Sequence, residues 1–171
     1  MRDFHITRKE CIKYIIICIF AIAIDLFTKN YIHTSMTEGQ SLSVIKDFFY
    51  IACVHNYGAA WGILSGARGV LFGVSMIAAI ALFKFFTDTK PEQVLSRIGL
   101  VLVFSGMLGN LLDRIIFGYV RDFLDFYIFG YNYPVFNVAD MCIVVGVGLY
   151  LLELIVGEYR LWKFKKSQQE K

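Results

Sequence analysis

Four apolar blocks, each close to the length of a membrane-spanning helix, constrain this chain more than any other feature. They cover residues 14–31, 69–86, 98–117 and 138–157. A helix needs about 20 mostly apolar residues to cross the roughly 30 Å hydrocarbon layer of a bilayer. The blocks reach that length only when polar residues near one end of each are included. We therefore predict an all-α membrane protein with four transmembrane helices, built as a single polytopic domain over residues 1–171.

The composition supports a membrane protein and excludes several other classes. Hydrophobic residues make up 57% and charged residues 18% of the chain, whereas soluble domains are about 45–50% apolar and about 25% charged. A chain this short cannot bury such an excess in a soluble core. Disordered, collagen-like and disulfide-stapled secreted chains do not fit this composition. No basic stripe of the kind that binds nucleic acid is visible, so no nucleic-acid partner is expected.

The basic residues predict the orientation of the spans. Twelve of the seventeen lysines and arginines lie in residues 2–13, 84–97 and 160–171, between or beyond the apolar blocks. The positive-inside rule places such clusters on the cytoplasmic side of the membrane. The N- and C-termini are therefore expected to be cytoplasmic. Residues 32–68 and 118–137 become the extracytoplasmic segments.

This topology brings a group of polar residues from three spans to the extracytoplasmic face. Ionisable groups at that depth are costly unless they are paired or face a wet cavity, which favours a shared polar site. The alternative is that they only mark helix ends in the headgroup region. Helical spacing places some of them on common faces, where they can form either a site or local pairs. The residues are Asp25 with Lys29; Asn110 with Asp113 and Arg114; and Asp140.

The first extracytoplasmic segment is too long for a simple turn. Residues 41–54 mix β-branched and aromatic residues with turn-prone flanks, which predicts short strands against the membrane face. Asn56 and Gly58 fit a turn that offers a side-chain amide to the site, although a purely structural turn fits equally well. Ala59–Leu64 is expected to form a short interfacial helix that carries Trp61. The strands predicted at residues 41–54 give the fold a small extracytoplasmic β element.

The second extracytoplasmic segment contains an acid in an unusual position. Residues 115–136 include nine aromatic residues, typical of an interfacial belt. Within them, residues 119–126 fit a short strand in which Asp122 shares a face with Val120 and Leu124, opposite to Asp125. An acid on the apolar face is desolvated. Its pKa is therefore expected to rise, so that Asp122 holds a proton near neutrality.

A second acid opens the fourth apolar block. Asn137 is suited to cap the helix, and Asp140 lies in its first turn, where the helix dipole favours an anion. A capping role alone would explain Asp140. However, when the surroundings give two acids different pKa values, one can act as the general acid and the other as the general base. Asp122 and Asp140, sharing one proton, would then activate a water molecule for attack on a peptide carbonyl.

Five segments of the chain together resemble the characteristic motifs of one family, lipoprotein signal peptidase, the bacterial signal peptidase II group of aspartic intramembrane proteases. They follow the family's order with near-family spacing and cover most of the chain. Any one motif would be weak, but five in sequence are highly specific. The segments are Asp25–Lys29, Asn56–Gly62, Gly106–Arg114, Val120–Phe123 and Phe136–Asp140.

The resemblance assigns roles to individual residues. Asp122 and Asp140 match the family's catalytic aspartates. Asp25 and Lys29 match a structural polar pair, and Arg121 adds a charge beside Asp122 that is expected to shift its pKa. Trp61 stands where the family more usually has Phe. The remaining positions line or support the site: Asn56, Gly58, Gly106, Asn110, Asp113, Arg114, Asn137 and Ala139.

The resemblance also implies an activity and a location. The reaction is removal of signal peptides from bacterial prolipoproteins, by cleavage just before a Cys that carries a diacylglyceryl group. The implied location is the bacterial cytoplasmic (inner) membrane, with the active site at the extracytoplasmic face. Membrane lipid and diacylglyceryl-modified prolipoproteins are the expected partners, globomycin-type peptide antibiotics the expected inhibitors, and a monomer the expected state. No cofactor is expected.

Four alternatives remain open at the level of sequence. A small transporter would use Asp25, Lys29, Asp113 and Asp140 as a proton or ion relay, and a non-catalytic membrane scaffold would need only the hydrophobicity. Residues 8–23 also resemble a secretory signal with an A-x-A site, although the family keeps this helix. No metal site is predicted, because the histidines and cysteines lack ligand spacing along the chain. A Cys53–Cys142 disulfide is a minor alternative.

Overall fold

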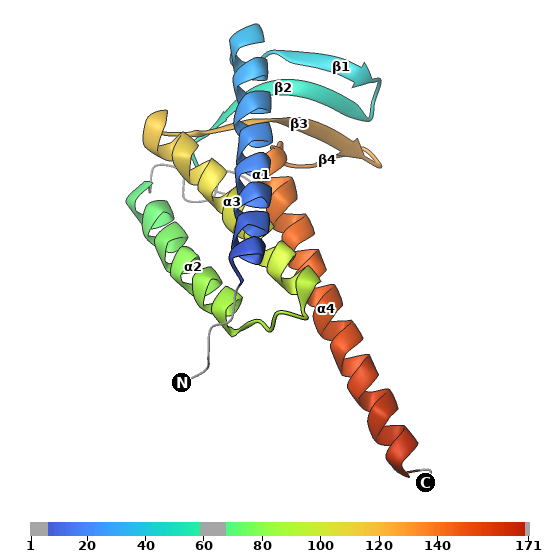
Figure 1. Cartoon of the computed structure of the whole chain (residues 1–171). Helices are drawn as coiled ribbons and strands as arrows, with labels where there is room; N and C mark the ends of the chain where they lie inside the picture. Colours follow the sequence, from blue (N-terminus) through green and yellow to red (C-terminus); the bar gives the residue numbers. More distant parts are fainter. Residues whose placement is uncertain (1–6, 59–67, 170–171) are drawn as a thin grey trace.

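In the computed structural model, which describes residues 7–58 and 68–169, four helices support a four-stranded antiparallel sheet that lies across one end of them (Figure 1). Figure 1 places the start of α1 and the end of α4 at the opposite end of the helices. The strands follow the order β1-β2-β3-β4. The elements are α1 (Arg8–Ser35), β1 (Ser41–Ile45), β2 (Phe49–Asn56), α2 (Arg68–Asp88), α3 (Val94–Ile116), β3 (Val120–Ile128), β4 (Tyr131–Asn132) and α4 (Val138–Gln169).

The four helices fall on the four predicted apolar blocks and are longer than the blocks, most of all α1 and α4. Thr7 and Glu10 form a capping box that begins α1 six residues before the first block. The last helix, α4, continues through the basic tail to Gln169. Charged residues at the ends of an apolar helix can extend it beyond the bilayer into water, where their side chains stay hydrated. Length and apolarity therefore set the core of each helix, and polar caps set its ends.

Three of the helices, α1, α3 and α4, are long and apolar enough to cross a membrane, as judged over the described residues. The membrane character predicted from the sequence is therefore confirmed. α2 lies at the predicted second span and has 21 residues, but it is not among these three. The prediction of four spans with cytoplasmic termini is therefore still a proposal.

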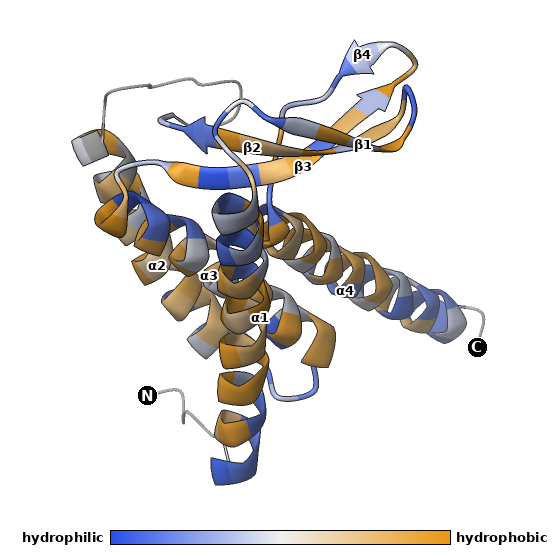
Figure 2. Cartoon of the chain, turned by 90° about the horizontal axis from the view of Figure 1, so that it is seen from above, coloured by the Kyte–Doolittle hydropathy of each residue, from blue (hydrophilic) through white to orange (hydrophobic). Residues whose placement is uncertain are grey.

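The outer surfaces of the helices are apolar over most of their length. Figure 2 shows hydrophobic residues along the helices and polar residues at the N-terminal end of α1 and the C-terminal end of α4. Large apolar side chains project from α1, where Phe20 is 67% and Phe27 70% exposed, and from α4, where Val144 is 71% exposed. Continuous apolar surface of this kind is rare on soluble monomers. It is explained here by contact with lipid.

The helix α3 packs against the other three helices and forms the centre of the bundle. Small residues allow α4 to approach it closely. A Cβ atom added to Gly99 would clash with the backbone oxygen of Gly146, and one added to Gly106 would clash with that of Ala139. Such small-residue contacts are the usual means of close helix packing in lipid. They hold the first half of α4 against α3, with Ala139 near the start of α4 beside Gly106.

The sheet has the strands that the sequence predicts. β1 and β2 form a hairpin within residues 41–56, and β2 pairs with β3 so that Val54 faces Asp122 and His55 faces Arg121. The sheet lies over the C-terminal ends of α1 and α3 and the N-terminal end of α4 (Figure 1). The polar residues of these three helices are therefore gathered at one end of the bundle, as predicted. The short helix expected at residues 59–64 lies outside the described residues.

Candidate active site

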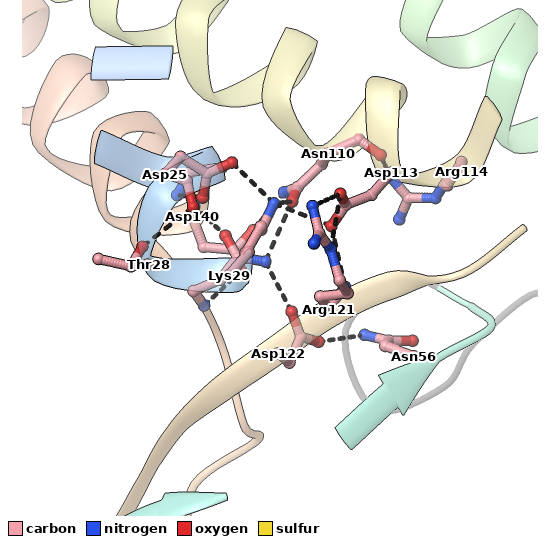
Figure 3. Close-up of polar contacts among 12 residues, drawn as sticks. Asp25, Thr28, Lys29, Asn56, Asn110, Asp113, Arg114, Arg121, Asp122 and Asp140 are labelled. Atoms are coloured by element: carbon pink, nitrogen blue, oxygen red, sulfur yellow. Dashed lines mark hydrogen bonds and ion pairs between the residues drawn. The ribbon is translucent and has the colours of Figure 1, made fainter. Parts of the chain in front are cut away.

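Asp122 lies on β3, on the side of the strand that faces the helix ends, and only 2% of its surface is exposed. Each of its carboxylate oxygens accepts a hydrogen bond from a side-chain amide. Nδ2 of Asn137 donates to Oδ1 at 2.6 Å, and Nδ2 of Asn56 donates to Oδ2 at 2.9 Å. Figure 3 shows Asp122 between β2 and the helices. The two amides hold the carboxylate in one orientation.

Asp140 lies in the first turn of α4 and forms a reciprocal cap with Asn137. The backbone N–H of Asp140 donates to Oδ1 of Asn137 at 3.0 Å, and the backbone N–H of Asn137 donates to Oδ2 of Asp140 at 3.1 Å. The predicted helix cap is therefore confirmed. Capping occupies only one carboxylate oxygen, however, because Oδ1 of Asp140 accepts from Nδ2 of Asn110 at 2.8 Å. Asp140 caps the helix and also joins the polar site.

Two asparagine amides connect the two acids. Nδ2 of Asn137 donates to Asp122 and also, at 3.0 Å, to Oδ1 of Asn110, whose own Nδ2 reaches Asp140. Both acids line the same cavity, which has a volume of about 380 Å³. Asn56, Asn110 and Arg114 also line it. The sequence expectation that Asp122 and Asp140 converge on one space is met by this geometry.

The surroundings raise the pKa of Asp122 to about 7. Burial is the largest cause, and the charge of Asp140 adds to it. The hydrogen bonds from Asn56 and Asn137, and the charge of Lys29, lower the pKa by smaller amounts. Asp122 is therefore close to half protonated at neutral pH. This is the property expected for Asp122 from its place on the apolar face of the strand.

A buried charge network lies directly behind the cavity. Lys29, which is fully buried, contacts Oδ2 of Asp25 at 2.8 Å and Oδ2 of Asp113 at 3.3 Å. Nε and Nη2 of Arg121 contact Oδ1 of Asp113 at 3.1 and 2.8 Å, and its backbone N–H donates to Oδ2 at 3.0 Å. Oδ1 of Asp25 accepts from the backbone N–H of Ala139 at 2.8 Å. Two cations and two anions balance here, as burial in an apolar setting requires.

This network fixes the orientation of the Asn110 amide. Nζ of Lys29 donates to Oδ1 of Asn110 at 2.9 Å. An ammonium group can only donate hydrogen bonds, so the amide oxygen must face Lys29 and the NH₂ group must face away from it. The NH₂ group is thereby directed at Asp140. The Asp25–Lys29 pair thus supports the site without lining the cavity.

An equivalent constraint acts on Asn56. Its Oδ1 accepts the backbone N–H of Gly58 at 2.9 Å, which forms an Asx turn, and its NH₂ group is left to face Asp122. Nη2 of Arg114 donates to the carbonyl of Gly58 at 3.0 Å. The turn at Asn56 and Gly58 is therefore structural and also presents the Asn56 amide to the site. The two interpretations that the sequence left open, a structural turn and a turn that serves the site, both apply.

All twelve predicted site residues lie in or next to this region, but in different layers. Gly106 and Ala139 form the close contact between α3 and α4, and Gly109 leaves room for Oδ2 of Asp25, which would lie 2.5 Å from an added Cβ. Residues 133–136 form one wall of the cavity. Sequence reasoning missed residues 133–135, whose only sequence signal is their place in the aromatic belt, and gave Phe136 no role beyond its place in the last motif.

Three sequence expectations need correction. The charge of Arg121 lies against Asp113, and the cation that acts on Asp122 is Lys29. The four cysteines are all free, so Cys53 and Cys142 do not form a disulfide. The argument from spacing along the chain is also incomplete, because ligand atoms of His33, Cys53 and His55 lie within 4.8 Å of one another in space. Spacing along one segment could not reveal a cluster that joins α1 to β2.

The charged residues suggested as a relay do not form a path across the bundle. Asp25, Lys29, Asp113 and Asp140 all belong to the cluster beneath the sheet (Figure 3). A relay would place ionisable groups at successive depths of the membrane. The arrangement is that of a single site at one end of the helices. Fold and site together define a helical membrane protein with two acids that line one cavity beneath a small sheet.

Comparison with known proteins places the chain in a family. The family profile described as Signal peptidase (SPase) II matches residues 17–156. The chain is similar to lipoprotein signal peptidases of Staphylococcus aureus, with 41% identity for strain bovine RF122 / ET3-1 and 42% for strain JH9. Each similarity spans 141 residues, 82% of this chain and 86% of the relative. The chain therefore belongs to the signal peptidase II family of proteases.

Solved structures agree with this assignment. One bacterial membrane enzyme, solved at 2.3 Å resolution, matches with a TM-score of 0.78 and 40% identity over 84% of this chain and 87% of its own. Another, solved at 1.9 Å, matches with a TM-score of 0.76 and 41% identity over 83% and 92%. The fold described above is therefore shared with experimentally determined membrane enzymes.

Proposed function

We propose that this protein is an aspartic endopeptidase that removes signal peptides from bacterial prolipoproteins, and that Asp122 and Asp140 are its catalytic residues. Membership of the signal peptidase II family supports the substrate class. The observation that carries the aspartic mechanism is the joint position of the two acids on one cavity, connected through Asn137 and Asn110.

The environments of the two acids support a division of roles. Asp122, with its raised pKa, holds the proton and is the general acid. Asp140 lies at the N-terminus of α4 and accepts hydrogen bonds on both oxygens, which stabilises its negative charge. It is therefore the general base. No metal or other cofactor is needed for this chemistry.

The reaction follows from these roles. Asp140 takes a proton from a water molecule as the water oxygen attacks the peptide carbonyl carbon, while Asp122 donates its proton to the carbonyl oxygen. The tetrahedral intermediate then collapses, the C–N bond breaks, and the proton held by Asp140 passes to the leaving nitrogen. Asp122 recovers its proton from the intermediate's hydroxyl group. The products are a carboxylic acid and an amine, and both aspartates return to their starting states.

The substrate is a prolipoprotein cleaved just before its diacylglyceryl-modified Cys. An apolar cavity of about 360 Å³ adjoins Asp140 and is lined by Phe136, Met141 and Val144, among others. Apolar side chains next to the reacting groups suit lipid chains and an apolar signal helix that arrive from the membrane. Globomycin-type peptides are expected to inhibit by occupying this region.

The proposal includes a topology. Four spans, with α2 as the second, place both termini in the cytoplasm and the sheet on the extracytoplasmic side of the bacterial inner membrane. The basic N-terminus and tail support this orientation through the positive-inside rule. The whole chain then forms one domain, which acts as a monomer.

The test is cleavage of a purified precursor by the full chain in detergent micelles. Diacylglyceryl-modified precursor should be cut before the modified Cys, unmodified precursor should not, and globomycin should block the reaction. Asp122→Asn and Asp140→Asn should each abolish turnover. Asp125→Asn is the matched control, because Asp125 is also a buried acid on β3 but does not line the cavity. Wild-type rates in either catalytic variant would refute the aspartic mechanism.

A further inference from the structure

A second cluster of reactive side chains lies outside the cavity described above. His33 at the end of α1 and Cys53 and His55 on β2 bring one ligand atom each within 4.8 Å of the others. Nδ1 of His33 lies 3.3 Å from Sγ of Cys53. The two residues from β2 alternate with Val54 and Asn56, so they project from the strand face opposite to Asn56. Cys53 is 1% exposed and is not part of a disulfide.

From this geometry, we propose that His33, Cys53 and His55 bind a divalent cation of the zinc class. Two imidazole nitrogens and one thiolate are preferred zinc ligands. Zinc bonds of about 2.3 Å to sulfur and about 2.0 Å to nitrogen place two tetrahedral ligands about 3.5 Å apart. The His33–Cys53 separation of 3.3 Å is close to that value. Three protein ligands leave the fourth position for water.

The surroundings of both histidines match those of metal ligands. Nδ1 of His55 lies 3.0 Å from Oε2 of Glu38, which leaves Nε2 for the ion. A carboxylate that holds the second ring nitrogen is a common partner of a zinc-bound histidine. The ring of His55 also stacks on Tyr119 at 3.9 Å. These contacts restrict the rotation of the ring before any ion binds.

His33 lies next to the backbone of β3. The backbone of Asp122 interacts with the His33 ring, although Nε2 of His33 has no hydrogen bond of normal geometry among the described residues. Coordination through Nδ1 requires the remaining proton to be on Nε2. This N–H then needs an acceptor, and a backbone carbonyl is the usual one. Metal binding would thereby satisfy both nitrogens of a partly buried ring.

Space and charge are also suitable. The three ligands line a cavity of about 270 Å³, which also includes Glu38 and Arg121. The charge of Arg121 is balanced by Asp113 at 2.8 Å. A thiolate on Cys53 and the carboxylate of Glu38 together carry two negative charges, which match a divalent cation. The proposed site is separate from the peptidase chemistry and does not depend on it.

The experiment uses the purified full chain in detergent micelles, freed of metal with a chelator and titrated with Co²⁺. Tetrahedral Co²⁺ bound to a thiolate gives a sulfur-to-metal charge-transfer band together with visible d–d bands. We expect both signals to saturate at one equivalent and to disappear when Zn²⁺ is added. Absence of the charge-transfer band in the wild-type chain would overturn the proposal.

Variants identify the ligands. Cys53→Ser should remove the charge-transfer band, and His55→Gln should abolish tight binding, whereas Cys142→Ser, which changes a half-buried thiol on α4, should bind like the wild type. Glu38→Gln should leave folding intact, because the Glu38 side chain is 58% exposed. It should weaken binding by about 10- to 100-fold, the usual effect of losing such a partner. Glu92→Gln is the matched control at another exposed glutamate.

Each variant also has an outcome that contradicts the site. A charge-transfer band that persists in Cys53→Ser would show that another thiol binds the ion. Unchanged affinity in Glu38→Gln would remove the argument for an oriented His55. Loss of binding in both Glu38→Gln and Glu92→Gln would show a surface-charge effect rather than a built site.

Discussion

Replacing Asp122 with Asn should make the protein more stable at high pH while it abolishes turnover. The pKa of Asp122 rises from the ordinary 3.8 to about 7 on folding. A shift of about three units corresponds to about 4 kcal/mol of folding free energy, at 1.36 kcal/mol for each unit. The cost arises because the ionised carboxylate is buried beside the charge of Asp140.

The direction of the pH effect follows from linkage. Because the folded pKa is above the unfolded value, the stabilising contribution is complete below pH 3.8 and is lost as the pH rises through about 7. More than half of this loss falls between about pH 5 and about pH 8. An asparagine carries no charge at any of these values. Its NH₂ group must, however, face a donor, either Asn56 or Asn137, at a cost of about 1 kcal/mol.

The assay is chemical or thermal unfolding of both proteins in the same micelles across this pH range. The wild type should lose stability relative to Asp122→Asn as the pH rises, and the variant should be the more stable by about 3 kcal/mol at about pH 8. Asp140→Asn serves as a comparison, since it removes the neighbouring charge and should also flatten the profile. A stability difference between wild type and Asp122→Asn that does not change with pH would refute the argument.

Three further predictions concern the residues around the acids. The rate of precursor cleavage should fall about tenfold for each pH unit above about 7, because Asp122 must hold a proton to act as the acid; a flat profile up to pH 9, about two units higher, would contradict this role. Lys29→Met should destabilise the protein by about 3–5 kcal/mol in unfolding experiments, because it leaves two buried carboxylates with one cation, and adding Asp25→Asn should restore part of the loss. Gly106→Ala should lower stability and activity because its Cβ meets the Ala139 carbonyl, whereas Gly148→Ala, with open space around it, should change neither.

The helices and strands could be predicted from local patterns. Apolar length marks the helical blocks, and β-branched and aromatic residues mark β1 and β2. The gathering of Asp25, Asp113 and Asp140 at one end followed from topology, because alternating spans bring alternate ends to one face. These inferences need only the order of residues along the chain and the direction of each span.

The contacts between elements could not be predicted in the same way. The pairing of Arg121 with Asp113 depends on how β3 returns over the end of α3, which no local pattern contains. The cluster of His33, Cys53 and His55 depends on the position of β2 beside α1. The cavity wall at residues 133–136 has no polar signal. In each case, the partner is chosen by tertiary packing rather than by sequence spacing.

Burial and the charge of Asp140 raise the pKa of Asp122, and residues behind the cavity limit that rise. Lys29 fixes the Asn110 amide by its oxygen, and the Asn56 amide is fixed by the Gly58 N–H, so that their NH₂ groups must face Asp140 and Asp122, respectively. These donors favour the ionised carboxylates, whereas burial and mutual repulsion oppose ionisation. If the amides could rotate, each acid would lose a donor, and the pKa of Asp122 would rise further above neutrality. The Asn56 turn and the charge of Lys29 therefore limit the rise of the Asp122 pKa, which leaves this acid able both to give and to regain a proton.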